Sequence, residues 1–306
     1  MSPQPVVQIE HLNKAYGSIR AVDDVSFEVS PGEIFGFVGP NGAGKTTTIE
    51  CAEGLRRPDS GTIRLFGLDP QNGDTRLKER LGIQLQAAAL PQRLKVWEAL
   101  DLFASFYPRP ADWPMLLEQM GLAEKRNAVF AKLSGGQKQR LFIALALVND
   151  PDLIFLDELT TGLDPQSRHA MWDLVRDVRA RGKTVILTTH FMEEAEHLCD
   201  RVAIIDHGRL VALDTPEKLI QNLGAESRVI FSAPAALDPA KLAGLPGVSR
   251  LERSGERVIV HGTGSKLIVE VANYLSLNDI PFRDLRTEQP NLEDVFLALT
   301  GREMRS

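Results

Sequence analysis

The chain has 306 residues, of which 43% are hydrophobic and 25% charged, as expected for a globular protein with one large and one small domain. Its formal net charge of −6 argues against a nucleic-acid-binding surface, which requires clustered Lys and Arg. The sequence lacks a signal peptide and an apolar run of the ~18 residues that span a bilayer, and Cys51 and Cys199 fit no disulfide or metal pattern, so we expect a cytoplasmic protein.

The first 86 residues alternate strand-like runs with turns. The run at 34–39 is apolar almost throughout, as for a strand covered on both faces. We expect an antiparallel β part at the N-terminus, followed by the first strand of a parallel sheet. The predicted strands cover residues 6–12, 21–29, 34–39, 61–67 and 80–86.

Residues 87–150 have a different character, because strand patterns give way to apolar residues at helical spacing. The predicted helices cover residues 96–107, 113–122 and 135–150. Pro108, Pro110 and Pro114 mark breaks near their ends. We interpret 87–150 as a helical insertion in an α/β domain.

Strands and helices alternate again after residue 150, which predicts a mainly parallel sheet with right-handed crossovers. The fold class is therefore α/β, with a mainly parallel sheet. The predicted elements are strands at 152–158 and 184–190, helices at 167–182 and 191–200, and a hairpin at 201–213.

A helix at 214–224 leads out of this domain, so we divide the chain into a domain of residues 1–222 and a small α+β domain of residues 223–306. The order in the second domain is β-α-β-β-α-β with a final helix, which predicts a ferredoxin-like unit. Its elements are expected at 228–232, 240–245, 248–262, 266–277, 281–287 and 291–301.

The stretch GPNGAGKT at 39–46 fits the phosphate-loop pattern G-x-x-x-x-G-K-[ST] completely, between a buried strand and a helix. Glycines allow several backbone N–H groups to point at one anion, and the helix dipole adds positive charge. Lys45 would contact the β- and γ-phosphates, and Thr46 would bind Mg²⁺. The predicted nucleotide-binding residues here are Gly39, Pro40, Asn41, Gly42, Ala43, Gly44, Lys45, Thr46 and Thr47.

Two carboxylates follow the buried strand LIFL, at Asp157 and Glu158. Adjacent carboxylates facing a phosphate loop are costly without a cation. We expect Asp157 to orient Mg²⁺ through water and Glu158 to polarise the attacking water. Such a site predicts a P-loop NTPase (RecA-like) core for the α/β domain and leaves hydrolysis, phosphotransfer and motor work open.

A second helix start suited to an anion occurs at LSGGQ, residues 133–137. Ser134 is the expected N-cap, and the N–H groups of Gly135, Gly136 and Gln137 would lie at the helix start. The stretch has no Lys or Mg²⁺ ligand of its own, so it should bind an anion weakly when alone.

Taken together, these stretches resemble the motifs of ABC-type ATPases, the ATP-binding subunits of ABC transporters. The resemblance covers residues 6 to about 220, with the motifs in the family's order. GPNGAGKTT resembles Walker A, LSGGQ the signature and LIFLDE Walker B. The remaining matches are Tyr16 for the aromatic residue on adenine, Gln86 for the Q-loop, TGLD with Asp164 for the D-loop, and His190 for the switch histidine.

The resemblance implies that two cassettes pair head to tail with ATP and Mg²⁺ between them, as a homodimer or with another cassette. The signature of one chain would cap the γ-phosphate held by the other. Glu158 would be the catalytic base, with Gln86 contacting Mg²⁺ and His190 orienting the water. Gln84 competes with Gln86 for the Q-loop role, and the family pattern favours Gln86.

One residue departs from the family pattern: Leu159 stands where Pro usually follows the Walker B glutamate. Proline would fix φ and stiffen the turn, whereas Leu leaves it freer without removing a chemical group. We expect this change to adjust the D-loop while activity is retained.

The resemblance implies transport driven through separate membrane-spanning permease subunits, with this chain on the cytoplasmic face of the membrane. The surface around Gln86 and the helical insertion, including residues 87–100, would receive their coupling helix. The ending NLEDVFLALTG at 291–301 resembles the C-terminal extension of ATP-binding subunits from drug-resistance and antibiotic exporters. A translation or DNA-repair ABC ATPase and a nucleotide-sensing regulator are the alternatives. The second domain is open to a stabilising, dimer-supporting or regulatory role.

Overall fold

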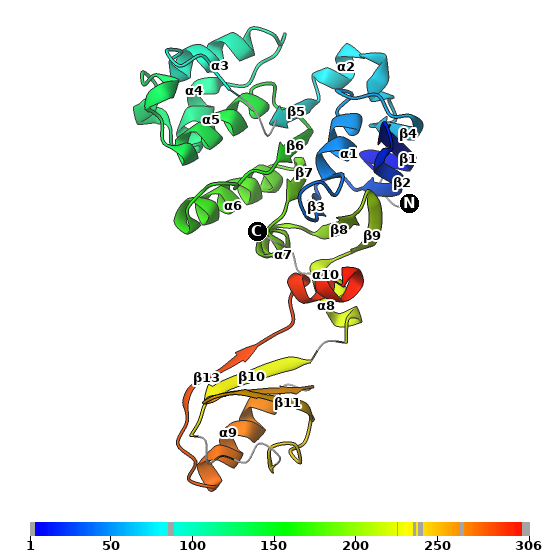
Figure 1. Cartoon of the computed structure of the whole chain (residues 1–306). Coiled ribbons are helices and arrows are strands. Elements are labelled where there is room, and N and C mark those ends of the chain that lie inside the picture. Colours follow the sequence, from blue (N-terminus) through cyan, green and yellow to red (C-terminus); the bar gives the residue numbers. More distant parts are fainter. Residues whose placement is uncertain are drawn as a thin grey trace. The chain divides into compact units, whose positions relative to one another are not determined.

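The computed structural model describes residues 4–84, 89–224, 226–234, 237, 241–263 and 266–301 (Figure 1). The chain divides after Pro216 into two compact units, which are described separately. Apart from its first residue, helix α8 (Pro216–Asn222) belongs to the second unit, although the sequence analysis placed it in the first domain. The domain boundary at residue 222 stays a prediction.

The first unit contains a six-stranded sheet in the order β5-β6-β7-β3-β8-β9. All neighbouring strands are parallel except the last pair, β8 and β9. Strands β3 and β6 are buried at every position, as their continuous apolar runs predicted. The strands are β3 (Ile34–Val38), β5 (Leu81–Gln84), β6 (Leu153–Asp157), β7 (Thr184–Thr189), β8 (Arg201–Asp206) and β9 (Arg209–Asp214).

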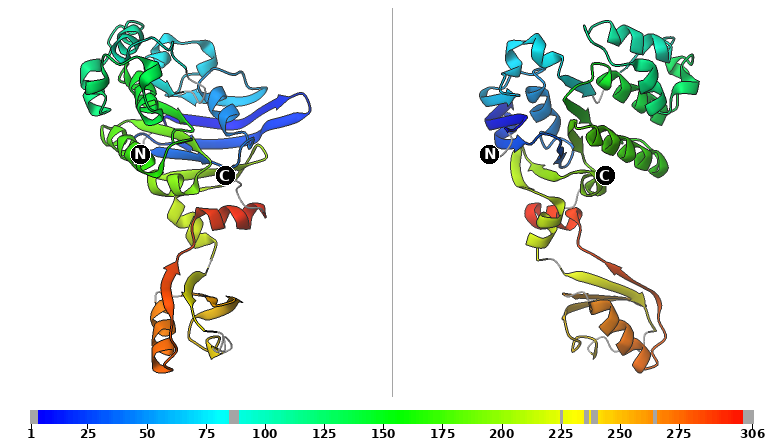
Figure 2. Two further views of the ribbon diagram at one scale, coloured as in Figure 1. Left: turned by 60° about the vertical axis from the view of Figure 1, so that its left-hand side comes forward. Right: turned by 180° about the vertical axis from the view of Figure 1, so that it is seen from behind.

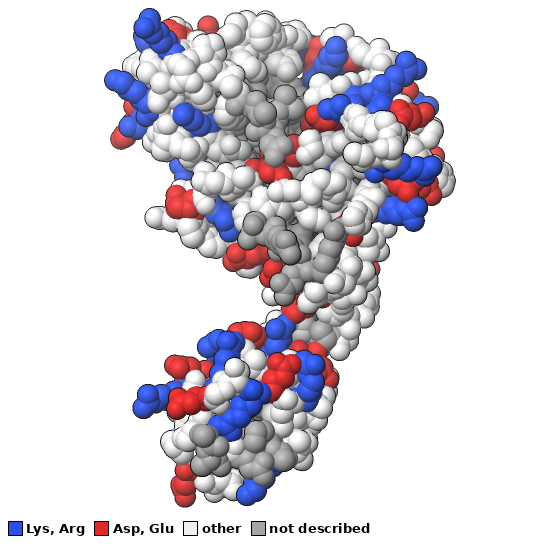
Figure 3. All heavy atoms as spheres, viewed as in Figure 1, with Lys and Arg blue, Asp and Glu red and all other residues white. Residues whose placement is uncertain are grey.

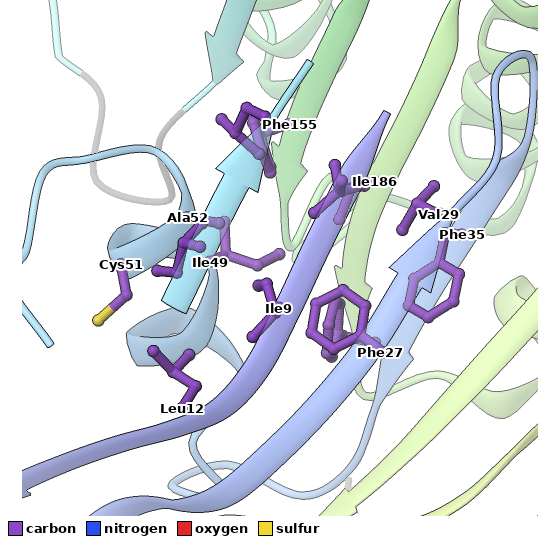
Figure 4. Packing of buried hydrophobic residues seen from close by; sticks show 14 of the residues in the cluster. Ile9, Leu12, Phe27, Val29, Phe35, Ile49, Cys51, Ala52, Phe155 and Ile186 are labelled. Atoms are coloured by element: carbon purple, nitrogen blue, oxygen red, sulfur yellow. The ribbon is translucent and has the colours of Figure 1, made fainter. Parts of the chain in front are cut away.

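A second, antiparallel sheet in the order β2-β1-β4 covers helix α1 and part of the central sheet. Its strands are β1 (Val7–Tyr16), β2 (Ile19–Val29) and β4 (Ser60–Leu65). The shared core contains a cluster of aromatic rings (Figure 4). The ring centroid of Phe27 lies 5.3 Å from that of Phe35 and 4.8 Å from that of Phe37. This core fixes α1 and the loop before it against both sheets.

The helices of the first unit form two groups (Figures 1 and 2). One group packs on the central sheet, and the other forms the insertion between β5 and β6, which contains α3, α4 and α5. The bounds are α1 (Lys45–Ala52), α2 (Thr75–Lys78), α3 (Val96–Ala104), α4 (Trp113–Gln119), α5 (Gly135–Leu147), α6 (Pro165–Ala180) and α7 (Met192–Leu198). Short 3₁₀ turns occur at Pro70–Asn72, Ala123–Lys125 and Phe130–Lys132.

The second unit has an antiparallel sheet in the order β11-β12-β10-β13, with α9 packed on one face. Its strands are β10 (Ser227–Ser232), β11 (Val248–Ser254), β12 (Arg257–Gly262) and β13 (Arg283–Glu288). Besides α8, it contains the helices α9 (Leu267–Leu277) and α10 (Leu292–Thr300). The helical stretch predicted at 240–245 begins outside the described residues, so the ferredoxin-like assignment stays a prediction.

The predicted fold class is confirmed: a mixed α/β cassette with a mainly parallel sheet, antiparallel sheets and a helical insertion. Several bounds differ, and α6 begins at Pro165, earlier than predicted, because Asp164 caps it. Within the described part of the chain, no helix is long and apolar enough to cross a membrane. On the face drawn in Figure 3, basic and acidic side chains are interspersed.

Candidate functional site

The predicted phosphate loop and acidic residues meet at one edge of the central sheet. Because β6, β7 and β3 are parallel neighbours, their carboxyl ends lie together, and ligands bind at such edges in open α/β sheets. Asp157 is paired with Thr188 in the ladder, and Val38 is paired with Thr189. The phosphate loop therefore starts beside the segment that carries His190.

The loop at 39–44 has a backbone that only glycine permits at two positions. A Cβ on Gly39 would lie 2.2 Å from the carbonyl oxygen of Ile205, and one on Gly44 would lie 2.1 Å from that of Ala21. Gly44 also has a φ of +103° at the N-cap of α1. Neighbouring strands thus enclose the loop base, while Asn41 and Gly42 stay exposed at its rim.

Lys45 is folded against its own loop. Its Nζ donates hydrogen bonds to the carbonyl oxygens of Gly39 (2.7 Å) and Pro40 (3.0 Å). Burial lowers the pKa of Lys45, and the negative charges of Glu158 and Asp157 oppose that shift. The ammonium group therefore lies between loop carbonyls and two carboxylates, where a phosphate group would join it.

Asp157 is buried at the end of β6, with a side chain directed at the loop. Its Oδ1 accepts a hydrogen bond from Thr188 Oγ1 and lies 3.5 Å from Thr46 Oγ1. Burial is the main cause that raises the pKa of Asp157, and Glu158 adds to it. A carboxylate beside a hydroxyl, both near an anion site, is a donor pair that fits a hard divalent cation.

Glu158 has a backbone conformation that is unusual for its residue type, with a φ of +49°. Its N–H donates to Thr188, whose hydroxyl oxygen is 2.9 Å away. Its carboxylate accepts a hydrogen bond from Thr161 Oγ1 (3.2 Å), and Oε1 lies 3.6 Å from His190 Nδ1. The side chains of Glu158 and His190 are 8% and 15% exposed, so this pair faces the site from a largely enclosed position.

The signature residues lie apart from this edge. Ser134 Oγ accepts a hydrogen bond from the N–H of Gln137, and Gln137 Oε1 accepts one from the N–H of Ser134. This capping box gives the backbone N–H of Gln137 a partner within the helix start. The N–H groups of Gly135 and Gly136 are therefore the ones that the helix start presents. Among the described residues, no hydrogen bond joins 134–137 to the phosphate loop.

Comparison with known proteins is consistent with this geometry. The ABC transporter family profile matches residues 22–161. A Nod factor export ATP-binding protein I from Ralstonia nicotianae is 40% identical over 98% of this chain and 95% of its own length. The corresponding protein from Paraburkholderia xenovorans is 42% identical over 99% of both chains.

The chain belongs to the ABC transporter family. It is an ATP-binding protein of that family and an ATPase. A solved ATP-binding subunit of an ABC transporter has a TM-score of 0.65 and 30% identity, over 72% of this chain and 93% of its own. A dimeric bacterial ABC transporter cassette has a TM-score of 0.62 and 25% identity, over 68% of this chain and 98% of its own.

Other predicted residues of this ABC ATPase are placed as follows. Tyr16 ends β1 beside α1 and is 41% exposed, with the Arg56 guanidinium 5.4 Å from its ring centroid. Asp164 caps α6 by accepting hydrogen bonds from Ser167, and Gly136 of the signature lies near the same Ser167. Gln86 lies outside the described residues, while its competitor Gln84 ends β5 and is buried.

Leu159, the departure from the family pattern, is buried, with only 2% of its surface exposed. Its apolar side chain therefore lies within the core, between Glu158 and the D-loop. Its effect on the D-loop stays a prediction.

Sequence reasoning missed Thr188 and Glu53. Thr188 donates to Asp157 and accepts from the N–H of Glu158, so it holds both acidic residues. Glu53, just after α1, is 8% exposed, and its Oε2 is buried without a hydrogen-bond partner. Burial raises the pKa of Glu53 to about 8, with smaller contributions from Asp157 and Glu50.

We predict that Glu53 makes stability fall with rising pH. A carboxyl group whose folded-state pKa exceeds its unfolded value stabilises fully below the unfolded pKa, near 4.5, and loses that contribution as pH rises to about 8. In the parent, the free energy of unfolding should therefore fall by on the order of 3 kcal/mol between pH 5.5 and 8.5, and Glu53→Gln should remove this fall.

The measurement is urea unfolding at both pH values, followed by tryptophan fluorescence. The three tryptophans, Trp97, Trp113 and Trp172, all lie in the first unit, so the signal reports that unit. Glu118→Gln, on an exposed face of α4, is the matched control. Equal pH dependence in the two variants would contradict the prediction.

Proposed function

We propose that this ABC ATPase hydrolyses ATP as a head-to-tail pair of cassettes and drives export through separate membrane-spanning subunits. The observation that carries the hydrolytic role is the pair Glu158 and His190, facing each other across 3.6 Å beside the phosphate loop. A carboxylate next to an imidazole at a phosphate site is suited to orienting and deprotonating an attacking water.

In this proposal each residue of the edge has one task. Lys45 and the loop N–H groups bind the β- and γ-phosphates, and Tyr16 stacks on adenine. Glu158 polarises the attacking water, while His190 hydrogen-bonds the γ-phosphate and orients that water. The positive φ of Glu158 is consistent with a side chain held in a fixed direction at a functional site.

Thr46 and Asp157 are the proposed Mg²⁺ ligands, with Gln86 as a third. When bound, Mg²⁺ neutralises phosphate charge and fixes the orientation of the triphosphate. Among the described residues, no group of three His, Cys, Asp or Glu side chains forms a metal site on its own. This fits a cation that is bound together with phosphate oxygens and water.

The separate position of the signature supports the paired arrangement. Ser134, Gly135, Gly136 and Gln137 have no cation of their own, and the two glycine N–H groups suit an anion already bound elsewhere. In the proposal they cap the γ-phosphate held by a second cassette, either a copy of this chain or a related one. ATP then joins the cassettes, and hydrolysis releases them.

The proposed export role rests on relatives similar along nearly their whole length. These are named Nod factor export ATP-binding protein I, so a Nod factor is the first cargo to test. We place the chain on the cytoplasmic face of the membrane, bound to permease subunits. The translation, DNA-repair and nucleotide-sensing alternatives have no comparable support.

Glu158→Gln is expected to lower kcat by about 10²-fold or more, because a general base contributes this much. ATP affinity should be retained, and an ATP-bound dimer should accumulate. Phosphate release, equilibrium ATP binding and light scattering measure the three quantities. The control is Glu193→Gln, an exposed carboxylate of α7. Hydrolysis at the parental rate would show that the base is another residue.

Ser134→Arg is expected to block hydrolysis and dimerisation while the monomer still binds ATP, since a bulky cation would fill the capping position. Ser105→Arg, at an exposed site after α3, controls for the added charge. A collapse of ATP affinity in the monomer would place the signature in the chain's own pocket and contradict the paired arrangement.

Affinity capture of the tagged chain from native membranes should retain a membrane-spanning subunit in an ATP-sensitive complex. Recovery of ribosomal or chromosomal partners in its place would favour one of the alternative classes.

A further inference from the structure

The segment that carries His190 contacts helix α6, which starts directly after the D-loop. Thr189 ends β7, His190 and Phe191 follow, and α7 begins at Met192. Both α6 and α7 pack against β7 (Figures 1 and 2). Two charged side chains, Arg168 and Glu194, lie between these elements.

Arg168, in the first turn of α6, stacks on the switch segment. Its guanidinium carbon lies 4.2 Å from the centre of the Phe191 ring, and that ring lies 4.1 Å from the His190 ring. The face of an aromatic ring attracts a cation electrostatically. Arg168 Nε is buried without a hydrogen-bond partner, and the positive charge of Arg168 also acts on the carboxylate of Glu194.

Glu194, in the first turn of α7, is almost completely buried, at 1% exposure. Its Oε1 accepts a hydrogen bond of 3.0 Å from the indole N–H of Trp172 on α6. Burial raises the pKa of Glu194, and its hydrogen bond from Trp172 and the positive charge of Arg168 oppose that rise. One carboxylate of α7 is therefore linked to α6, through the indole of Trp172 and the charge of Arg168.

We infer that Glu194 and Arg168 are positioning residues that couple the D-loop and the start of α6 to the switch segment, and so set the direction of His190 toward Glu158 and the γ-phosphate. The inference rests on the proposed role of His190. A shift of α6, which would follow a change at the D-loop, moves Arg168 and Trp172 together. Arg168 then displaces the ring of Phe191, and Trp172 displaces the carboxylate of Glu194. Both movements change the position of His190, which lies in the same segment.

The coupling predicts a loss in kcat with little change in ATP binding, because a displaced catalytic group lowers the rate while the phosphate loop is untouched. Arg168→Met keeps the aliphatic stem without the cation, and Glu194→Gln keeps the shape without the charge. We expect kcat to fall about tenfold or more in each, with ATP affinity within about twofold of the parent.

Matched controls are Arg176→Met on α6 and Glu193→Gln on α7. Arg176 contacts Asp173 and the His197 carbonyl, and both control residues are exposed. Phe191→Leu removes only the ring between Arg168 and His190, so it tests the coupling if Glu194→Gln does not fold.

A double-mutant cycle with His190→Ala decides whether the effect passes through His190. Phosphate release by the full chain is followed over long incubations, so that low rates are measurable. In the His190→Ala background, Arg168→Met and Glu194→Gln should lower kcat no further. Additive losses would overturn the coupling, as would parental kcat in all three variants.

The outcomes separate the inference from the proposed function. If His190→Ala leaves kcat unchanged, the role of His190 fails and the coupling fails with it. If His190→Ala lowers kcat while the Arg168, Phe191 and Glu194 variants do not, only the coupling fails. A loss of ATP affinity equal to the loss of rate would show a structural effect and overturn the positioning role.

Discussion

A buried carboxylate at the end of a parallel strand, Asp157, is the constraint around which the site is arranged. Burying its charge is costly unless hydrogen bonds or cations offset it. The Thr188 hydroxyl and the Lys45 ammonium supply part of that compensation. In the proposed function a divalent cation would supply the rest, and the buried charge would serve to bind that cation.

The same reasoning extends outward from the edge. Three acidic side chains each lie next to a hydrogen-bond donor: Asp157 next to Thr188, Glu158 next to Thr161, and Glu194 next to Trp172. The first and third of these contacts cross from one strand or helix to another. Because buried polar contacts need close geometry, small relative movements of these elements change them together. Such an arrangement suits a site whose geometry must change when a neighbouring element moves.

Much of this was predictable from the sequence, because the decisive patterns are local. The phosphate loop is a contiguous pattern between a buried strand and a helix, and LIFLDE shows both the burial of β6 and the acidic end. The contact of Glu194 with Trp172 was not predictable, because 22 residues separate them. Periodicity tells which face of a helix is buried but not which side chain it meets. Glu53 gave no signal, because its burial depends on how α1 packs.

The side-chain conformation of Lys45 has a consequence for the anions that the loop binds. Its ammonium group already has two carbonyl oxygens as partners, Gly39 and Pro40. An incoming ligand must compete with these dipoles, and only a group with several negative charges offers a clear electrostatic gain. A triphosphate carries more negative charge than inorganic phosphate or a nucleoside monophosphate, so it would compete better with these carbonyl oxygens for the ammonium group.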